Sequence, residues 1–119
     1  MKTRNWFITG ISSGLGKALA EKVLQKGDFV IGTFRRQSLV DEFNAKHEGN
    51  GMSYLLDVTN HSRIEQLIPN IISKHGRIDI LVNNAGIGFI GAIEEASIEE
   101  YRAVFEANFF GVLLSLIHI

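Results

Sequence analysis

Three glycines follow the first apolar run of the chain and leave a stretch of backbone with few side chains. They lie at positions 10, 14 and 16 of the segment FITGISSGLGKAL, residues 7–19. Gly10 permits a tight turn, Gly14 lets the backbone approach a pyrophosphate, and Gly16 lets a helix pack closely on a strand. The pyrophosphate would meet the free N–H groups at the start of the next helix. The spacing G-x-x-x-G-x-G therefore predicts a dinucleotide site, and a strand–helix turn without a ligand is the alternative.

A P-loop is the other phosphate motif that this segment could contain. That motif, GxxxxGK[ST], requires a glycine ahead of the Gly-Lys pair and a hydroxyl residue after it. Around Gly16 and Lys17 these positions hold Ile11 and Ala18. The hydroxyl that would bind magnesium is absent, and we exclude a P-loop.

The elements that would position this segment alternate between strand and helix. Apolar runs predict strands at residues 5–9, 29–34, 52–56 and 78–82, and helical spacing predicts helices at 15–25, 38–46 and 61–74. Ser97 and Glu100 form a capping box that opens a last helix, which should run through Asn108. We expect Ser38 to cap the second helix and Pro69 to weaken or kink the third.

This alternation predicts the α/β class, with a parallel sheet covered by helices on both faces. Right-handed crossovers favour a doubly wound, Rossmann-type sheet, in which the strand order of this half is 3-2-1-4. Ligands bind such sheets beyond the carboxyl ends of the strands, where the order switches between strands 1 and 4. The glycine segment should lie at that switch.

Composition and charge narrow the classes of function. The 119 residues suit one domain or part of one, and the 45% of apolar residues allow a buried core. A net charge of −1 argues against nucleic acid or a membrane surface as a partner. There is no cysteine, and the four histidines lack the spacing of a metal site. No apolar run reaches the ~20 residues of a membrane span, and no signal peptide precedes the first strand, so we expect a cytoplasmic protein.

Four segments, in order, resemble the motifs of the short-chain dehydrogenase/reductase family. The run TGISSGLG at residues 9–16 resembles its TGxxxGxG, and Asp57-Val58 resembles its acidic position after strand 3. The run NNAG at residues 83–86 matches its motif after strand 4, and NFFG at residues 108–111 matches its NxxG. The resemblance covers about residues 6–113. It implies a nicotinamide dinucleotide and hydride transfer to or from a small alcohol or carbonyl substrate.

The resemblance also implies a role for each matched residue. The glycine segment would hold the cofactor phosphates, Asp57 would accept a hydrogen bond from the adenine amino group, and residues 84–86 would lie against a cofactor ribose. Asn108 would be the Asn of the family's Asn-Ser-Tyr-Lys tetrad, which holds the water of the proton relay. The implied cofactor-binding residues are Gly10, Ile11, Ser12, Ser13, Gly14, Leu15, Gly16, Arg35, Arg36, Asp57, Val58, Asn84, Ala85 and Gly86; Asn108 is the implied catalytic residue, and no metal ligand is implied.

The end of the second strand bears on which nicotinamide cofactor is bound. NAD-specific dinucleotide folds place a carboxylate there, on the ribose hydroxyls. This chain has Phe34 at that position, followed by Arg35 and Arg36. Two guanidiniums can clamp a 2′-phosphate, and Arg35 matches the position that NADP members of the family use. Ser13, by contrast, stands where those members carry a basic residue. We favour NADP(H), with NAD(H) as the alternative.

The remaining members of the tetrad do not match this chain. Tyr54 and Tyr101 are followed four residues later by Val58 and Phe105, so neither fits the family's Tyr-x-x-x-Lys. We therefore interpret residues 1–119 as the dinucleotide-binding Rossmann portion of such a domain, truncated after the fourth strand and its helix, with the catalytic half absent. The full-length protein would be an oxidoreductase and a homo-oligomer, and this portion would be inactive alone. The alternative is a non-catalytic NAD(P)-binding or redox-sensing module, against which Asn108 argues because a binding module needs no relay residue.

Overall fold

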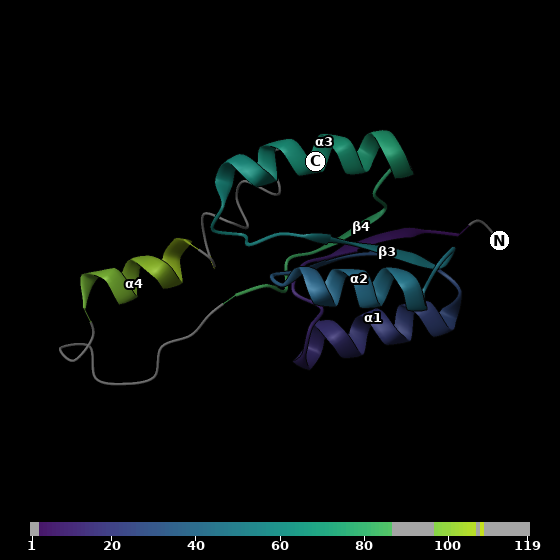
Figure 1. Cartoon of the computed structure of the whole chain (residues 1–119), viewed down its shortest axis with the longest axis horizontal. Coiled ribbons are helices and arrows are strands. Elements are labelled where there is room, and N and C mark those ends of the chain that lie inside the picture. Colours follow the sequence, from purple (N-terminus) through teal and green to yellow (C-terminus); the bar gives the residue numbers. More distant parts are fainter. Residues whose placement is uncertain (1–2, 87–96, 107, 109–119) are drawn as a thin grey trace.

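The computed structural model describes residues 3–86, 97–106 and 108, and it places a parallel sheet between two layers of helices (Figure 1). The strands are β1 (Asn5–Ile8), β2 (Phe29–Phe34), β3 (Gly51–Leu55) and β4 (Ile80–Val82). The helices are α1 (Gly14–Lys26), α2 (Gln37–Lys46), α3 (His61–His75) and α4 (Ile98–Phe105). None of the described helices is long and apolar enough to cross a membrane.

The strand order in the sheet is β3-β2-β1-β4, and every pair is parallel. In the register, Phe7 of β1 lies beside Ile31 of β2 and Leu81 of β4. The predicted order 3-2-1-4 and the doubly wound arrangement are thus confirmed. The connection from β3 to β4 crosses the whole sheet, so the carboxyl ends of β1 and β4 meet at the switch point.

Alternating side chains of the central strands supply two cores, because successive residues of a strand point to opposite faces. Phe7 and Ile31 are fully buried under α3, which contributes an apolar stripe at helical spacing: Ile64, Leu67, Ile68 and Ile71. Ile8 and Val30 are fully buried on the other face, under α1 and α2. This double coverage explains why β1 and β2 are apolar without alternation.

Several helix boundaries differ from the prediction, for local reasons. Arg36, not Ser38, precedes α2: its backbone is extended, at φ −121° and ψ 131°, and Ser38 falls inside the first turn. The expected Ser38 cap is therefore wrong. Pro69 lies within α3, which runs as one helix of 15 residues from its cap, where Asn60 Oδ1 accepts the Arg63 N–H at 3.1 Å.

The capping box that opens α4 is confirmed. Ser97 Oγ accepts the Glu100 N–H at 3.1 Å, and the Glu100 carboxylate accepts the Ser97 N–H at 3.4 Å. The α-helix ends at Phe105, and Glu106 and Asn108 follow in wider, π-helical turns, so the chain is helical at Asn108 as predicted but with a different hydrogen-bond pattern. Such turns inside helices are frequent at functional sites. The expected continuation of this helix beyond Asn108 lies outside the described residues.

Candidate functional site

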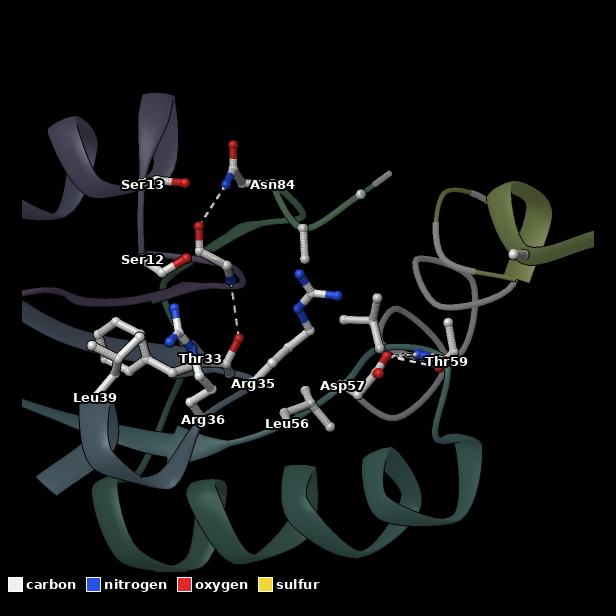
Figure 2. A pocket seen from close by; sticks show the side chains of 16 residues that line it. Ser12, Ser13, Thr33, Arg35, Arg36, Leu39, Leu56, Asp57, Thr59 and Asn84 are labelled. Atoms are coloured by element: carbon white, nitrogen blue, oxygen red, sulfur yellow. Dashed lines mark hydrogen bonds between the residues drawn. The ribbon is translucent and has the colours of Figure 1, made fainter. Parts of the chain in front are cut away.

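A cavity of about 390 Å³ opens beyond the carboxyl ends of the strands, at the switch between β1 and β4 (Figure 2). Its walls come from the glycine turn after β1, the ends of β2 and β3, Leu39 of α2, the loop after β4, and Ala103 of α4. Ten of the residues proposed from sequence line it: Gly10, Ser12, Ser13, Arg35, Arg36, Asp57, Val58, Asn84, Ala85 and Gly86. Segments that are far apart in the chain thus meet at one site, where a doubly wound sheet is expected to bind its ligand.

The glycine turn is fixed to β2 through Thr33. The hydroxyl of Thr33 accepts the Gly10 N–H at 3.0 Å, and its carbonyl accepts the Ile11 N–H at 3.2 Å. Thr33 is only 1% exposed and also lines the cavity. The turn is therefore held in place by a neighbouring strand as well as by its own backbone.

The loop after β4 is fixed to β1 through Thr9 and Asn84. The hydroxyl of Thr9 accepts the N–H groups of Asn84 and Ala85, at 3.1 and 3.0 Å. In return, the side-chain amide of Asn84 donates to the Gly10 carbonyl at 2.9 Å (Figure 2). These bonds give partners to partly buried backbone groups and connect the loop after β4 to the glycine turn.

Neither threonine was assigned a role from the sequence, although Thr9 is the first residue of the run that resembles TGxxxGxG. A threonine inside an apolar, β-branched run fits the strand pattern by itself, so nothing marks its hydroxyl as functional. The one available signal is position, because Thr9 precedes the glycine turn and Thr33 closely precedes the Arg35-Arg36 pair. Nothing in the sequence indicated that Ala103 would line the cavity either.

The three glycines of the motif have different surroundings. Gly10 has φ +70°, and a Cβ there would lie 3.0 Å from the Ala85 Cα. A Cβ on Gly16 would overlap the Gly10 carbonyl oxygen and the side-chain amide of Asn84. Gly14 has φ +60° and faces open space, with no protein atom within 4 Å of a Cβ. Gly10 and Gly16 thus allow the segments to pack, whereas Gly14 leaves room beside the turn.

Four of the proposed cofactor residues do not line the cavity: Ile11, Gly14, Leu15 and Gly16. Ile11 is 3% exposed, and its side chain fills the space that Gly32 leaves on β2. Leu15 is 85% exposed at the start of α1. A contact between these residues and a cofactor stays a prediction.

The charged groups of the cavity come from the ends of β2 and β3. Arg35 extends into the cavity between the glycine turn and Asp57 (Figure 2). Asp57 Oδ1 accepts the N–H and the hydroxyl of Thr59, at 2.9 and 2.7 Å. Burial acts to raise the pKa of Asp57, but these two hydrogen bonds and the charge of Arg35 outweigh it, and the pKa lies below its ordinary value. Asp57 is therefore a carboxylate at neutral pH. Phe34, at the end of β2, adds no charge to the cavity. Its ring packs on that of Phe43, with 5.8 Å between the ring centroids.

The end of α4 brings Asn108 to the loop after β4. A Cβ on Gly86 would lie 2.6 Å from the Asn108 Oδ1, so the amide sits directly against the glycine. His61, at the start of α3, is near the same end of α4: its Nε2 lies 3.0 Å from Glu106 Oε2, within ion-pair distance but outside hydrogen-bond geometry. The arrangement places the predicted catalytic residue beside the cavity, and its role stays a prediction. Among the described residues, no cluster of His, Asp and Glu could hold a metal ion.

Comparison with known proteins identifies relatives of the chain. Residues 4–118 match the model of the short chain dehydrogenase family. The chain is 42% identical over 106 residues to 3-ketodihydrosphingosine reductase of Bacteroides thetaiotaomicron, covering 89% of this chain and 37% of that protein. It is 39% identical over 106 residues to the 3-oxoacyl-[acyl-carrier-protein] reductase FabG of Buchnera aphidicola, covering 89% and 43%.

Solved structures agree with this result. A short-chain dehydrogenase from Streptomyces avermitilis superposes with a TM-score of 0.92 at 39% identity, over 98% of this chain and 43% of that one. ElxO with NADP bound superposes with a TM-score of 0.89 at 30% identity, over 98% and 49%. The chain thus spans less than half the length of these relatives. With the fold, the ordered motifs and the family match in agreement, the chain belongs to the short-chain dehydrogenase family.

Proposed function

We propose that this chain forms the cofactor-binding part of an NAD(P)-dependent oxidoreductase that transfers hydride between a nicotinamide cofactor and a small alcohol or carbonyl substrate. The observation that carries the proposal is the cavity at the switch between β1 and β4, bounded by a glycine turn that Thr33 and Asn84 hold in place. Two structural relatives support it, since ElxO was solved with NADP and a Thermococcus sibiricus alcohol dehydrogenase with 5-hydroxy-NADP.

The residues present fit a dinucleotide. The open space at Gly14 and the exposed Ser12 and Ser13 at the start of α1 suit a pyrophosphate, which helix N–H groups and hydroxyls can bind. The carboxylate of Asp57 suits the adenine amino group, a hydrogen-bond donor. Val58 would contact the adenine, and the loop of residues 84–86 would lie against a ribose. When bound, the cofactor would supply the hydride carrier, and the protein would hold and orient it.

We propose NADP(H) as the preferred cofactor and NAD(H) as the weaker one. Arg35 and Arg36 both line the cavity, and Phe34 places no carboxylate at the end of β2 to repel a 2′-phosphate. Ser13 offers no charge, so the preference depends on the two arginines. A guanidinium binds a phosphate through two parallel hydrogen bonds, which are stronger than neutral ones.

Arg35→Ala tests this preference. We expect the variant to bind NADPH about 30-fold more weakly, a loss of about 2 kcal/mol, and to bind NADH as the wild type does. Binding is measured by the fluorescence of the reduced nicotinamide. The matched control is Arg77→Ala, because Arg77 is an exposed arginine at the opposite end of the sheet, beside Asp79. An unchanged ratio of NADPH to NADH affinity in the Arg35 variant would contradict the assignment.

The proposed catalytic role of this chain belongs to Asn108. An Asn inside a helix is a poor helix former, and a π-helical turn here brings its amide against Gly86, next to the cavity. We infer that it holds a water of the proton relay. This placement favours the oxidoreductase over a module that only binds the cofactor.

The location and assembly of the full-length protein are further proposals. We expect a cytoplasmic protein that forms a homo-oligomer, as the family resemblance implies. Cell fractionation tests the first, and size-exclusion chromatography with light scattering tests the second. A full-length protein that stays monomeric at micromolar concentration would contradict the oligomer.

A further inference from the structure

The hydroxyl of Thr33 differs from the other buried hydroxyls of the described residues. Three such side chains are each 1% exposed: Thr9, Thr33 and Ser53. Ser53 donates within the core, to the Val40 carbonyl at 3.2 Å or to the Asn44 side chain at 3.1 Å. Thr9 accepts two N–H groups and does not line the cavity. Thr33 accepts one N–H group and forms part of the cavity wall.

The hydroxyl of Thr33 keeps its hydrogen available. A threonine hydroxyl has one donor and two acceptor positions, and Gly10 uses an acceptor position through its N–H. No atom of the described residues accepts a hydrogen bond from Thr33 Oγ1. A buried donor without a partner is unfavourable, so a ligand that supplies an acceptor at this wall gains by binding there. The bond from Gly10 also polarises the hydroxyl and makes it a better donor.

The neighbours of Thr33 indicate which part of a ligand would meet this donor. Thr33 is bonded to Gly10 on one side, and Arg35, two positions further along the chain, extends into the same cavity (Figure 2). A group that lies over the glycine turn and reaches Arg35 passes Thr33. In the dinucleotide proposed above, that group is the adenosine ribose, with its 2′-phosphate in the NADP form.

We propose that Thr33 is a cofactor-binding residue whose hydroxyl donates a hydrogen bond to an oxygen of the adenosine ribose or of its 2′-phosphate. This inference rests on the proposed binding of a nicotinamide dinucleotide. In this proposal, the Thr33 hydroxyl oxygen accepts the Gly10 N–H of the glycine turn and the same hydroxyl donates to the ligand that the turn binds. The position of the turn and the affinity for the adenosine half are then coupled through a single side chain.

Thr33→Val tests the proposal, with Thr33→Ser as the matched control. Valine has nearly the shape of threonine without the hydroxyl, and serine keeps the hydroxyl. Four adenosine ligands are titrated by calorimetry against the 119-residue chain: 5′-AMP, 2′-deoxy-5′-AMP, 3′-deoxy-5′-AMP and 2′,5′-ADP. Thr33→Val also removes the acceptor of the Gly10 N–H, so a small loss common to all four ligands is expected. We expect the ligands that carry the partner oxygen to lose about five- to tenfold more affinity than those that lack it. The identity of the less affected ligands distinguishes a ribose hydroxyl from the 2′-phosphate. Thr33→Ser should follow the wild type.

The same titrations separate this inference from the proposed function. If Thr33→Val weakens all four ligands equally, the hydroxyl acts only by shaping the turn, and the proposal is overturned; an absence of any effect overturns it too. Thermal melting monitored by circular dichroism shows whether the variant is folded. If Thr33→Val is unfolded, binding by the wild-type chain tests the proposal instead. Equal wild-type affinity for 5′-AMP, both deoxy ligands and 2′,5′-ADP overturns it. A wild-type chain that binds neither these ligands nor NADPH overturns the proposed function, and this inference with it.

Discussion

Gly14 and Gly16 lie two positions apart in the same motif, but glycine is needed at each position for a different reason. Gly16 sits where the start of α1 touches the glycine turn and the loop after β4, and a Cβ there would overlap both. Gly14 has a positive φ and no protein neighbour within 4 Å of a Cβ. One glycine is required by packing within the protein, and the other by backbone conformation and by the space that it leaves.

Substitution by alanine should separate these two roles. We expect Gly16→Ala to lower the free energy of unfolding by about 3 kcal/mol, because backbone at Gly10 must move and the Asn84 hydrogen bond must break. Gly14→Ala should cost only about 1 kcal/mol, the strain of a positive φ. Urea unfolding followed by circular dichroism measures both. Equal losses for the two variants would contradict the packing role of Gly16.

A larger side chain at position 14 tests whether the cofactor binds beside the glycine turn. Gly14→Val should leave the chain folded and weaken NADPH binding, because its branched Cβ would occupy the space proposed for the pyrophosphate.

The position of the glycine turn could be predicted from the sequence, since the spacing of the glycines alone placed it between β1 and α1. The sequence could not identify the hydroxyls of Thr9 and Thr33, whose function depends on which backbone N–H groups of other segments come within reach.

At the scale of elements, the carboxyl end of α3 packs on β3 through two titratable rings. Tyr54 Oη lies 2.6 Å from His75 Nε2, and the Phe29 ring is 5.4 Å from that of His75. Burial, and after it the charge of Lys74, lower the pKa of His75 below its ordinary value. Burial raises the pKa of Tyr54. The His75 and Tyr54 rings are therefore both neutral at physiological pH where the helix end packs on β3.

This arrangement predicts that the chain loses stability in mild acid. Below pH 6.5, the ordinary histidine value, His75 of the unfolded chain takes up a proton that the folded chain resists, so the free energy of unfolding falls as the pH drops. His47 acts in the same direction, because burial lowers its pKa too. Urea unfolding at pH 7.5 and at about pH 5.5 measures the effect, above the range in which Asp28 and Asp57 titrate. His75→Gln should flatten the dependence, and an unchanged slope would contradict this account.

The order of the elements could be predicted from the sequence, but several of their ends could not. The strand order follows from strand–helix alternation and crossover handedness, which do not depend on single residues. Helix ends depend on local competition: Arg36 rather than Ser38 precedes α2, and α4 is followed after Phe105 by π-helical turns. A propensity pattern does not contain that information.

At the scale of the whole molecule, the cavity is assembled from six segments, yet the catalytic residues that the family resemblance implies are only partly present. Asn108 is in place beside Gly86. The residue four positions after each tyrosine is Val58 or Phe105, and neither can lower the pKa of a phenol as a lysine does. Binding and catalysis should therefore be separable in this chain.

We expect the 119-residue chain to bind NADPH without oxidising it. Binding should be visible in the nicotinamide fluorescence, and the absorbance of the reduced nicotinamide should stay constant in the presence of small ketones and aldehydes. The physical reason is the missing proton donor, since hydride transfer to a carbonyl requires a proton at its oxygen. Measurable turnover with any such substrate would show that another group in the chain delivers the proton.

The hydrogen bonds made by Thr9, Thr33 and Asn84 also predict how slowly the backbone amides of the site exchange their hydrogens. The amide hydrogens of Gly10, Asn84 and Ala85 lie outside the strands, yet each is bonded to a threonine hydroxyl at the end of a strand. Releasing them requires the glycine turn or the loop after β4 to move away from the strand ends, so they should exchange with deuterium more slowly than amides of exposed loops. Amides of the exposed Ser12 and Ser13 provide the fast reference. A loop that is already rigid loses little conformational entropy when a ligand arrives, and this preorganisation leaves more of the contact energy for affinity.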